Sequence, residues 1–310
     1  MSTIDNRTDA KEIARKLREP VTEASKLAKA LGLDPFPVNY WIVDHDEMNR
    51  LIAYGGFQQR YPHWRWGMQY DRQQKKGQFL GGKAFEIVNN DNPSHAFLQE
   101  SNSLADQKAV ITHVEAHADF FANNEWFGLF TDGVDEQSAA GRPGPDATAM
   151  LARHADRIRE FMEDPEIDRE AVERWIDHVL CLEDTIDQHA PYAPVEPERR
   201  EAERAEGRDP EEAVEELALS AEVTGQVFDE EFFEKAGDEE ERGFPTEPVE
   251  DLIGFLAAHG KQYDDEADRG VEMTDWQREI FEILRREAYY FAPQKMTKVM
   301  NEGWACVAPD

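Results

Sequence analysis

Apolar residues recur at helical spacing near the beginning of the chain. Over residues 8–32, Ile13, Leu17, Leu27 and Leu31 lie among charged residues, and this periodicity predicts an amphipathic helix. Pro20 lies inside the segment and is expected to kink or split the helix. A short apolar run follows at 40–43, and then a helix over 45–54 that ends at two glycines, Gly55 and Gly56.

The next segments predict an irregular region and a hairpin. Residues 57–82 are rich in aromatic side chains without a clear period, and we expect irregular structure there. Two strands are predicted over 83–89 and 95–99, joined by the turn-forming residues 90–93. Together the two strands predict a small antiparallel sheet or hairpin.

The clearest helix of the chain follows the hairpin. Asn102 or Ser103 can cap a helix that runs to about residue 122. Apolar periodicity predicts four further helices, over 145–163, 166–184, 247–260 and 274–303. The predicted fold class is therefore α+β, mainly α. A strand hairpin ahead of the helix that begins at 103 is also the arrangement of zincin metallopeptidases, so we expect a zincin-like helical domain.

One long stretch differs in composition from the rest. Residues 194–246 are dominated by Glu and contain few large apolar groups, so they cannot bury enough surface to offset their ordering entropy. We expect a flexible acidic insertion there. It separates an N-terminal part, 1–193, from a C-terminal helical part, 247–310.

Charge and composition exclude several functions. The 310 residues include 34 Lys and Arg against 66 Asp and Glu, a formal charge of −32. Such a surface repels phosphate groups, which argues against nucleic-acid and anionic-membrane partners. Because the chain has neither a membrane-spanning run nor a signal sequence, we expect a cytoplasmic protein. The excess of acid, with little Lys, is typical of proteins from halophiles.

The helix predicted over 103–122 contains a candidate metal site. His113 and His117 are four residues apart, which places both imidazoles on one helical face. This is the spacing of zinc ligands in HExxH helices, although the motif here is HxExH. Glu115 lies about 200° around the helix from His113, so it is not placed as the general base. A histidine pair at this spacing is also compatible with ordinary packing.

A third ligand has to come from elsewhere in the chain. Glu302 is the best candidate and Glu287 the second, although Glu302 can also be an ordinary exposed carboxylate. Zinc is the expected metal, and the catalytic residues stay unassigned. Around the site we expect Asp119, Asn123, Asn124, Tyr290, Asn301 and Glu86 to act as supporting or pocket residues.

Several motifs make the sequence similar to the SpoVR family, named after a stage V sporulation protein. They cover most of the chain outside the acidic insertion: YPHWRWGMQYD at 61–71, FEIVNN at 85–90, 93–98, NSLADQ at 102–107, HVxxH at 113–117, DFFANN at 119–124, EAYYFAPQ at 287–294 and TKVMNEGWA at 297–305.

The resemblance implies a role in sporulation or stress response, without a defined reaction. It implies two partners, a PrkA-type serine protein kinase and a von Willebrand A-domain protein. Family members continue beyond the NEGWA motif, so we expect this chain to be a C-terminally truncated form. Two functions remain open: a zinc-dependent hydrolase or a degenerate relative of one, and a non-catalytic adaptor in a complex with these partners.

Overall fold

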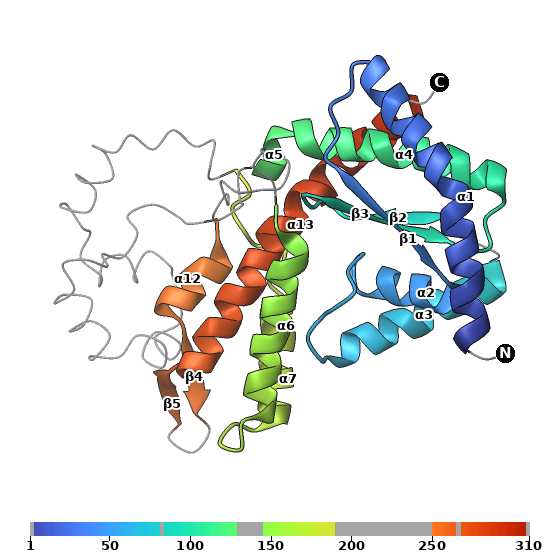
Figure 1. The fold of residues 1–310 in the computed structure, drawn as a ribbon. Helices are drawn as coiled ribbons and strands as arrows, with labels where there is room; N and C mark the ends of the chain where they lie inside the picture. Colours follow the sequence, from blue (N-terminus) through green and yellow to red (C-terminus); the bar gives the residue numbers. More distant parts are fainter. Residues whose placement is uncertain (1–2, 81–83, 129–144, 190–249, 265–267, 308–310) are drawn as a thin grey trace, which may run out of the picture. The chain divides into compact units, whose positions relative to one another are not determined.

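The computed structural model of the protein describes residues 3–80, 84–128, 145–189, 250–264 and 268–307 (Figure 1). The predicted acidic insertion over 194–246 lies outside these residues. The chain divides into two compact units. The first consists of Met1–Arg169 with Tyr290–Asp310, and the second of Glu170–Tyr289. None of the described helices is both long and apolar enough to cross a membrane.

A three-stranded sheet lies within the first unit, in the order β1-β3-β2. β2 (Glu86–Val88) and β3 (Ser94–Gln99) pair antiparallel, which confirms the predicted hairpin. β1 (Val38–Val43) pairs with β3 in parallel, so the sheet is mixed rather than antiparallel as expected. A parallel pair needs a long crossover, and this one contains the helices between β1 and β2.

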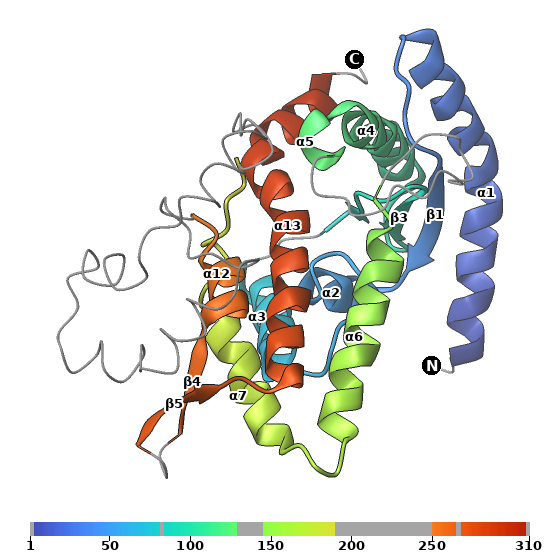
Figure 2. The same cartoon turned by 90° about the vertical axis from the view of Figure 1, so that its left-hand side faces the viewer.

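Helices cover both faces of this sheet (Figures 1 and 2). On one face, α1 (Thr3–Ala30) and α4 (Leu104–Asn123) bury Leu98 of β3. On the other, α2 (His45–Ala53) buries Phe97. Neighbouring strand residues point to opposite faces, so both faces of β3 are apolar and both need a cover.

Most helices lie where the sequence predicts them. α1 continues through Pro20 without a break, and α2 ends before Gly55 and Gly56, which both have positive φ angles. The C-terminal part of the last helix, α13 (Asp275–Val307), belongs to the first unit. The remaining predicted helices are α6 (Ala147–Glu163), α7 (Arg169–Leu180), α12 (Leu252–His259) and α13 (Asp275–Val307). A short helix that was not expected, α5 (Glu125–Gly128), follows α4.

The expectation of irregular structure over 57–82 is wrong, because α3 (Trp64–Leu80) occupies much of it. Of its first turns, Trp66 is buried whereas Trp64 and Met68 are exposed. Trp66 donates to the carbonyl of Tyr61, and Arg60 lies over its ring. Because α3 has large apolar side chains on its exposed face as well as on its buried face, its sequence does not show the apolar spacing that predicts a helix.

In its described residues, the second unit has a small hairpin and three helical segments. β4 (Lys261–Asp264) and β5 (Arg269–Glu272) pair antiparallel. Asp251 caps α12 by accepting from the Gly254 amide, and its carboxylate also binds Arg285 at 2.5 Å. One buried carboxylate thereby fixes the beginning of α12 against α13 within this unit.

Candidate metal site

α4 begins with a reciprocal cap. The Ser103 hydroxyl accepts from the Asp106 amide, and the Asp106 carboxylate accepts from the Ser103 amide. Such a capping box satisfies two backbone donors at the first turn. It fixes where the helix starts and therefore which side chains face the sheet.

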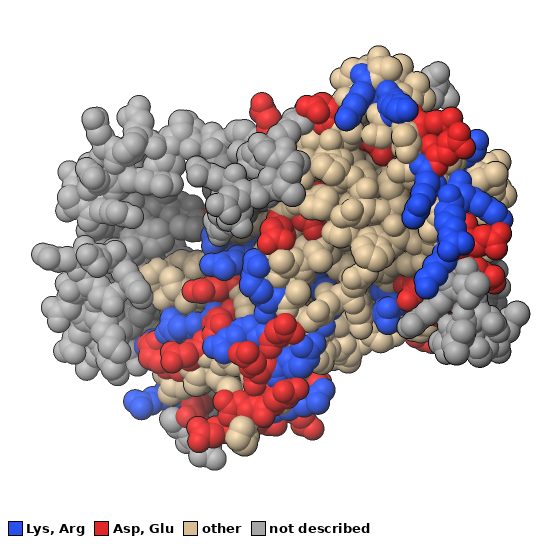
Figure 3. All heavy atoms as spheres, in the orientation of Figure 1, with Lys and Arg blue, Asp and Glu red and all other residues tan. Residues whose placement is uncertain are grey.

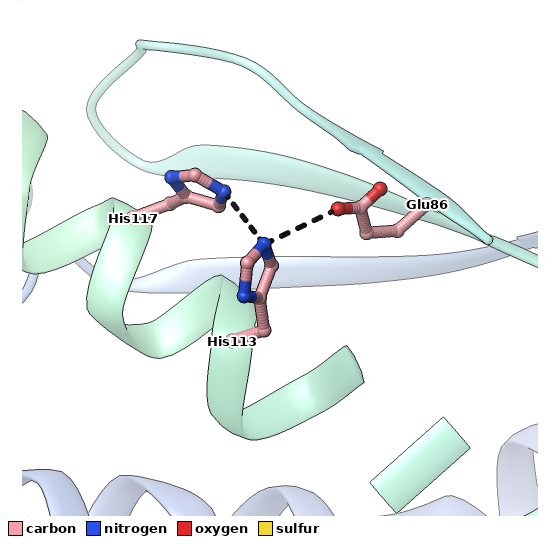
Figure 4. Close-up of side chains that lie close together, drawn as sticks. All are labelled: Glu86, His113 and His117. Carbon is pink, nitrogen blue, oxygen red and sulfur yellow. Dashed lines mark hydrogen bonds and ion pairs between the residues drawn. The ribbon is translucent and has the colours of Figure 1, made fainter. Parts of the chain in front are cut away.

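His113 and His117 lie on the face of α4 predicted from their spacing (Figure 4). Their ring centroids are 4.5 Å apart and the rings are nearly perpendicular. The two Nε2 atoms are 3.0 Å apart. His117 is only 4% exposed, whereas the His113 side chain is 24% exposed, so the His117 side of the pair is the one shielded from water.

The other ring nitrogens are both occupied by oxygen acceptors on α13. Nδ1 of His113 lies 2.9 Å from the carbonyl oxygen of Ala305, and Nδ1 of His117 lies 2.7 Å from Oδ1 of Asn301. Because a carbonyl oxygen only accepts, each Nδ1 carries a proton. In the neutral rings, both Nε2 atoms then present lone pairs to each other. This arrangement is repulsive unless a proton or a metal cation lies between them.

Two carboxylates lie next to these nitrogens. A Glu86 oxygen is 3.7 Å from Nε2 of His113, and Figure 4 shows this side chain pointing from β2 toward the ring. A Glu302 oxygen is 4.0 Å from Nε2 of His113 and 3.8 Å from that of His117. Among the described residues, Glu86, His113 and His117 form the cluster able to hold a metal ion.

Burial dominates the electrostatics of the cluster. It raises the pKa of Glu86 above its ordinary value, although the neighbouring His113 opposes the change. It lowers the pKa of His117, although the hydrogen bond to Asn301 opposes that change. Burial disfavours the charged form of each group, and neutral imidazole is the form that binds metal ions.

Asp119, two residues beyond His117, connects three segments of the first unit. One carboxylate oxygen accepts from the Asp34 amide at 2.6 Å and from the Asn123 side chain at 3.0 Å. The other accepts from the indole of Trp304 at 3.1 Å. Asp119 therefore holds α4 to the end of α13, beside the histidine pair.

The comparison with known proteins assigns the family. A family model described as "SpoVR like protein" matches residues 11–308. The chain belongs to the SpoVR family. The "Uncharacterized protein YcgB" of Escherichia coli is 30% identical over 290 residues, which are 92% of this chain and 51% of that protein. The chain thus spans about half the length of this SpoVR-family relative. No solved structure matches.

The matched SpoVR region includes every residue predicted for the site, and most of them lie together. The carboxylates of Glu86 and Glu302 lie next to the Nε2 atoms of His113 and His117, and Asn301 binds His117. The other predicted residues make contacts elsewhere. The Asn123 side chain donates to the Asp119 carboxylate, and the Tyr290 hydroxyl donates to the Asn90 carbonyl. The Asn124 side-chain amide donates to the Thr297 hydroxyl at 3.4 Å.

Glu115 and Glu287 are not part of the candidate metal site in the first unit of this SpoVR-family chain. Glu115 points to the sheet and accepts from the Tyr40 hydroxyl at 2.9 Å, in agreement with its predicted direction. Glu287 is buried and belongs to the second unit. Sequence reasoning missed the carbonyl of Ala305 as a partner of His113, because backbone acceptors leave no signal in a sequence.

Proposed function

We propose that this SpoVR-family chain binds a zinc ion between His113 and His117, with Glu86 and Glu302 supplying carboxylate oxygens. The observation that supports the proposal is the pair of Nε2 atoms facing each other at 3.0 Å while each Nδ1 binds an oxygen. Metal-binding histidines typically donate their second N–H to a carbonyl or carboxylate oxygen, which fixes the tautomer. Imidazole nitrogens with carboxylate oxygens are a donor set suited to zinc.

The site supports a function related to metal-dependent hydrolysis. A zinc ion there would supply Lewis-acid chemistry, polarising a carbonyl group and making water a stronger acid. The chain's own residues orient the imidazoles through Ala305 and Asn301 and exclude water from the His117 side of the pair. Glu115 is not placed as a general base, because its carboxylate binds Tyr40 instead.

Metal content tests the proposal directly. Protein purified in high salt without chelators is analysed by plasma mass spectrometry, beside the double variant His113→Ala/His117→Ala. We expect about one zinc ion per wild-type chain, and its loss in the double variant. His178→Ala, which changes an exposed histidine on α7, is the matched control and should keep the metal.

Two results would contradict the proposal. One is wild-type protein without bound metal even after incubation with zinc. The other is a double variant with an unchanged zinc content. Either result would make the pair a buried hydrogen-bonded contact between helices, as in a non-catalytic adaptor.

A further inference from the structure

The two carboxylates beside the histidine pair are held differently. Glu86 belongs to β2, which pairs with β3, and its side chain is 22% exposed. Glu302 belongs to the last turns of α13, and its side chain is 54% exposed. Exposed side chains change rotamer within nanoseconds. Glu302 can therefore leave the histidines without movement of the backbone, whereas Glu86 is confined by the sheet.

Glu302 lies close to both histidines rather than to one. Its oxygen is 3.8 Å from Nε2 of His117 and 4.0 Å from Nε2 of His113, so a cation held by both nitrogens would also attract this carboxylate. It approaches from the solvent side, because it is the most exposed of the four side chains. A ligand that reaches the site from solvent therefore meets Glu302 first.

A second partner is available to Glu302 once it leaves. Lys298 lies four residues earlier on α13 and is exposed. Side chains four residues apart are neighbours on a helix surface, and opposite charges at this spacing attract weakly. The structure places the carboxylate near the histidines, and a rotamer change would bring it within reach of Lys298.

We propose that Glu302 is an exchangeable ligand that closes the metal site, while Glu86, His113 and His117 hold the metal permanently. This inference rests on the proposed zinc site. An incoming carboxylate or hydroxamate anion replaces Glu302: the coordination bond from Glu302 breaks, a bond from the incoming anionic oxygen forms, and Glu302 pairs with Lys298. When the ligand enters as a hydroxamic acid, its proton passes to solvent. The site accordingly selects ligands that carry an acidic oxygen-donor group.

The test uses the full chain loaded with cobalt(II), whose visible absorption reports its coordination. Acetohydroxamate is titrated into wild-type protein, Glu302→Gln and Lys298→Gln. If Glu302 closes the site in about nine molecules of ten, Glu302→Gln should keep its cobalt and bind acetohydroxamate about tenfold more tightly. Lys298→Gln should bind it more weakly than wild type, because the open position of Glu302 loses its partner.

Two control variants complete the experiment. Lys295→Gln makes the same charge change on α13 at a position that is not four residues from Glu302, and it should bind acetohydroxamate like wild type. Glu86→Gln should weaken cobalt binding by about tenfold or more, as expected for a permanent ligand. Far-ultraviolet circular dichroism of each variant checks that the helices are intact.

The inference fails if Glu302→Gln loses its cobalt as completely as His117→Ala, because Glu302 would then be a permanent ligand. It also fails if the affinity for acetohydroxamate is the same in Glu302→Gln and wild type. A wild-type protein that binds no cobalt or zinc would overturn the metal site itself. The outcomes are distinguishable, because failure of the exchange alone leaves the cobalt spectrum in place.

Discussion

At the residue scale, the site combines a local signal with distant partners. The spacing of His113 and His117 identifies one helical face, and this part of the site was predictable from the sequence. The partners of their Nδ1 atoms were not, because Asn301 is 184 residues from His117 and Ala305 acts through its backbone. Glu86 was predicted only as a nearby group, although its carboxylate lies 3.7 Å from His113.

Glu115 provides a prediction at this scale. It is 5% exposed, and burial raises its pKa above the ordinary value near 4.5. The folded protein therefore holds this proton more tightly than the unfolded chain, and the free energy of unfolding decreases as the pH rises from about 4.5 through the raised pKa. Glu115→Gln removes this contribution but keeps an acceptor for Tyr40.

The measurement is urea unfolding of wild type and Glu115→Gln at a series of pH values from about 4 to about 8. Wild type should lose stability relative to the variant as the pH rises through this range. Glu125→Gln, at an exposed carboxylate in α5, is the matched control. Parallel curves for wild type and Glu115→Gln would refute the prediction.

At the scale of elements, a helix was easier to predict from the sequence when more of its surface is buried. α4 buries nine of its residues and has a capping box, and its range was predicted almost to the residue. α3 exposes Trp64 and Met68, and its helical character was missed. β1 was found only as a short apolar run, because parallel pairing with β3 depends on contacts between distant segments.

The beginning of α6 gives a prediction for an element. Asp91, from the loop between β2 and β3, accepts from the backbone amides of Ala147 and Thr148, both at 3.1 Å. Asp146 occupies the usual capping position but makes no capping bond. Asp91→Ala should lower the free energy of unfolding by about 1–3 kcal/mol, because it leaves buried amides without an acceptor.

Chemical denaturation compares this variant with Asp146→Ala. The second substitution removes a carboxylate from the nominal cap and should change stability by less than about 0.5 kcal/mol. Equal losses in the two variants would show that Asp91 does not act as the cap.

At the scale of the whole molecule, the sequence predicted the fold class better than the organisation. A mainly helical α+β fold follows from periodicity alone. Periodicity does not reveal which segments form the first unit, because this unit joins Met1–Arg169 to the segment that begins at Tyr290, inside α13. A continuous helical pattern contains no sign that its two parts belong to different units.

The net charge of −32 predicts how the whole molecule responds to salt. On the face shown in Figure 3, acidic and basic side chains are interspersed, but the total leaves many carboxylates without a basic counterpart. Raising KCl from about 0.1 M to about 1 M shortens the screening length from about 10 Å to about 3 Å. The thermal unfolding midpoint should rise over this range, as measured by circular dichroism. A constant or falling midpoint would contradict the halophilic interpretation.

The antiparallel match between α4 and α13 has a consequence for changes in chain length. His113 pairs with Ala305, and His117, four residues later on α4, pairs with Asn301, four residues earlier on α13. Inserting or deleting one residue within either four-residue interval would rotate one partner by about 100° and break the match. Insertions and deletions between the two helices do not alter this correspondence. Homologous chains that keep the site can therefore differ greatly in the length between the helices, but not within these two short intervals.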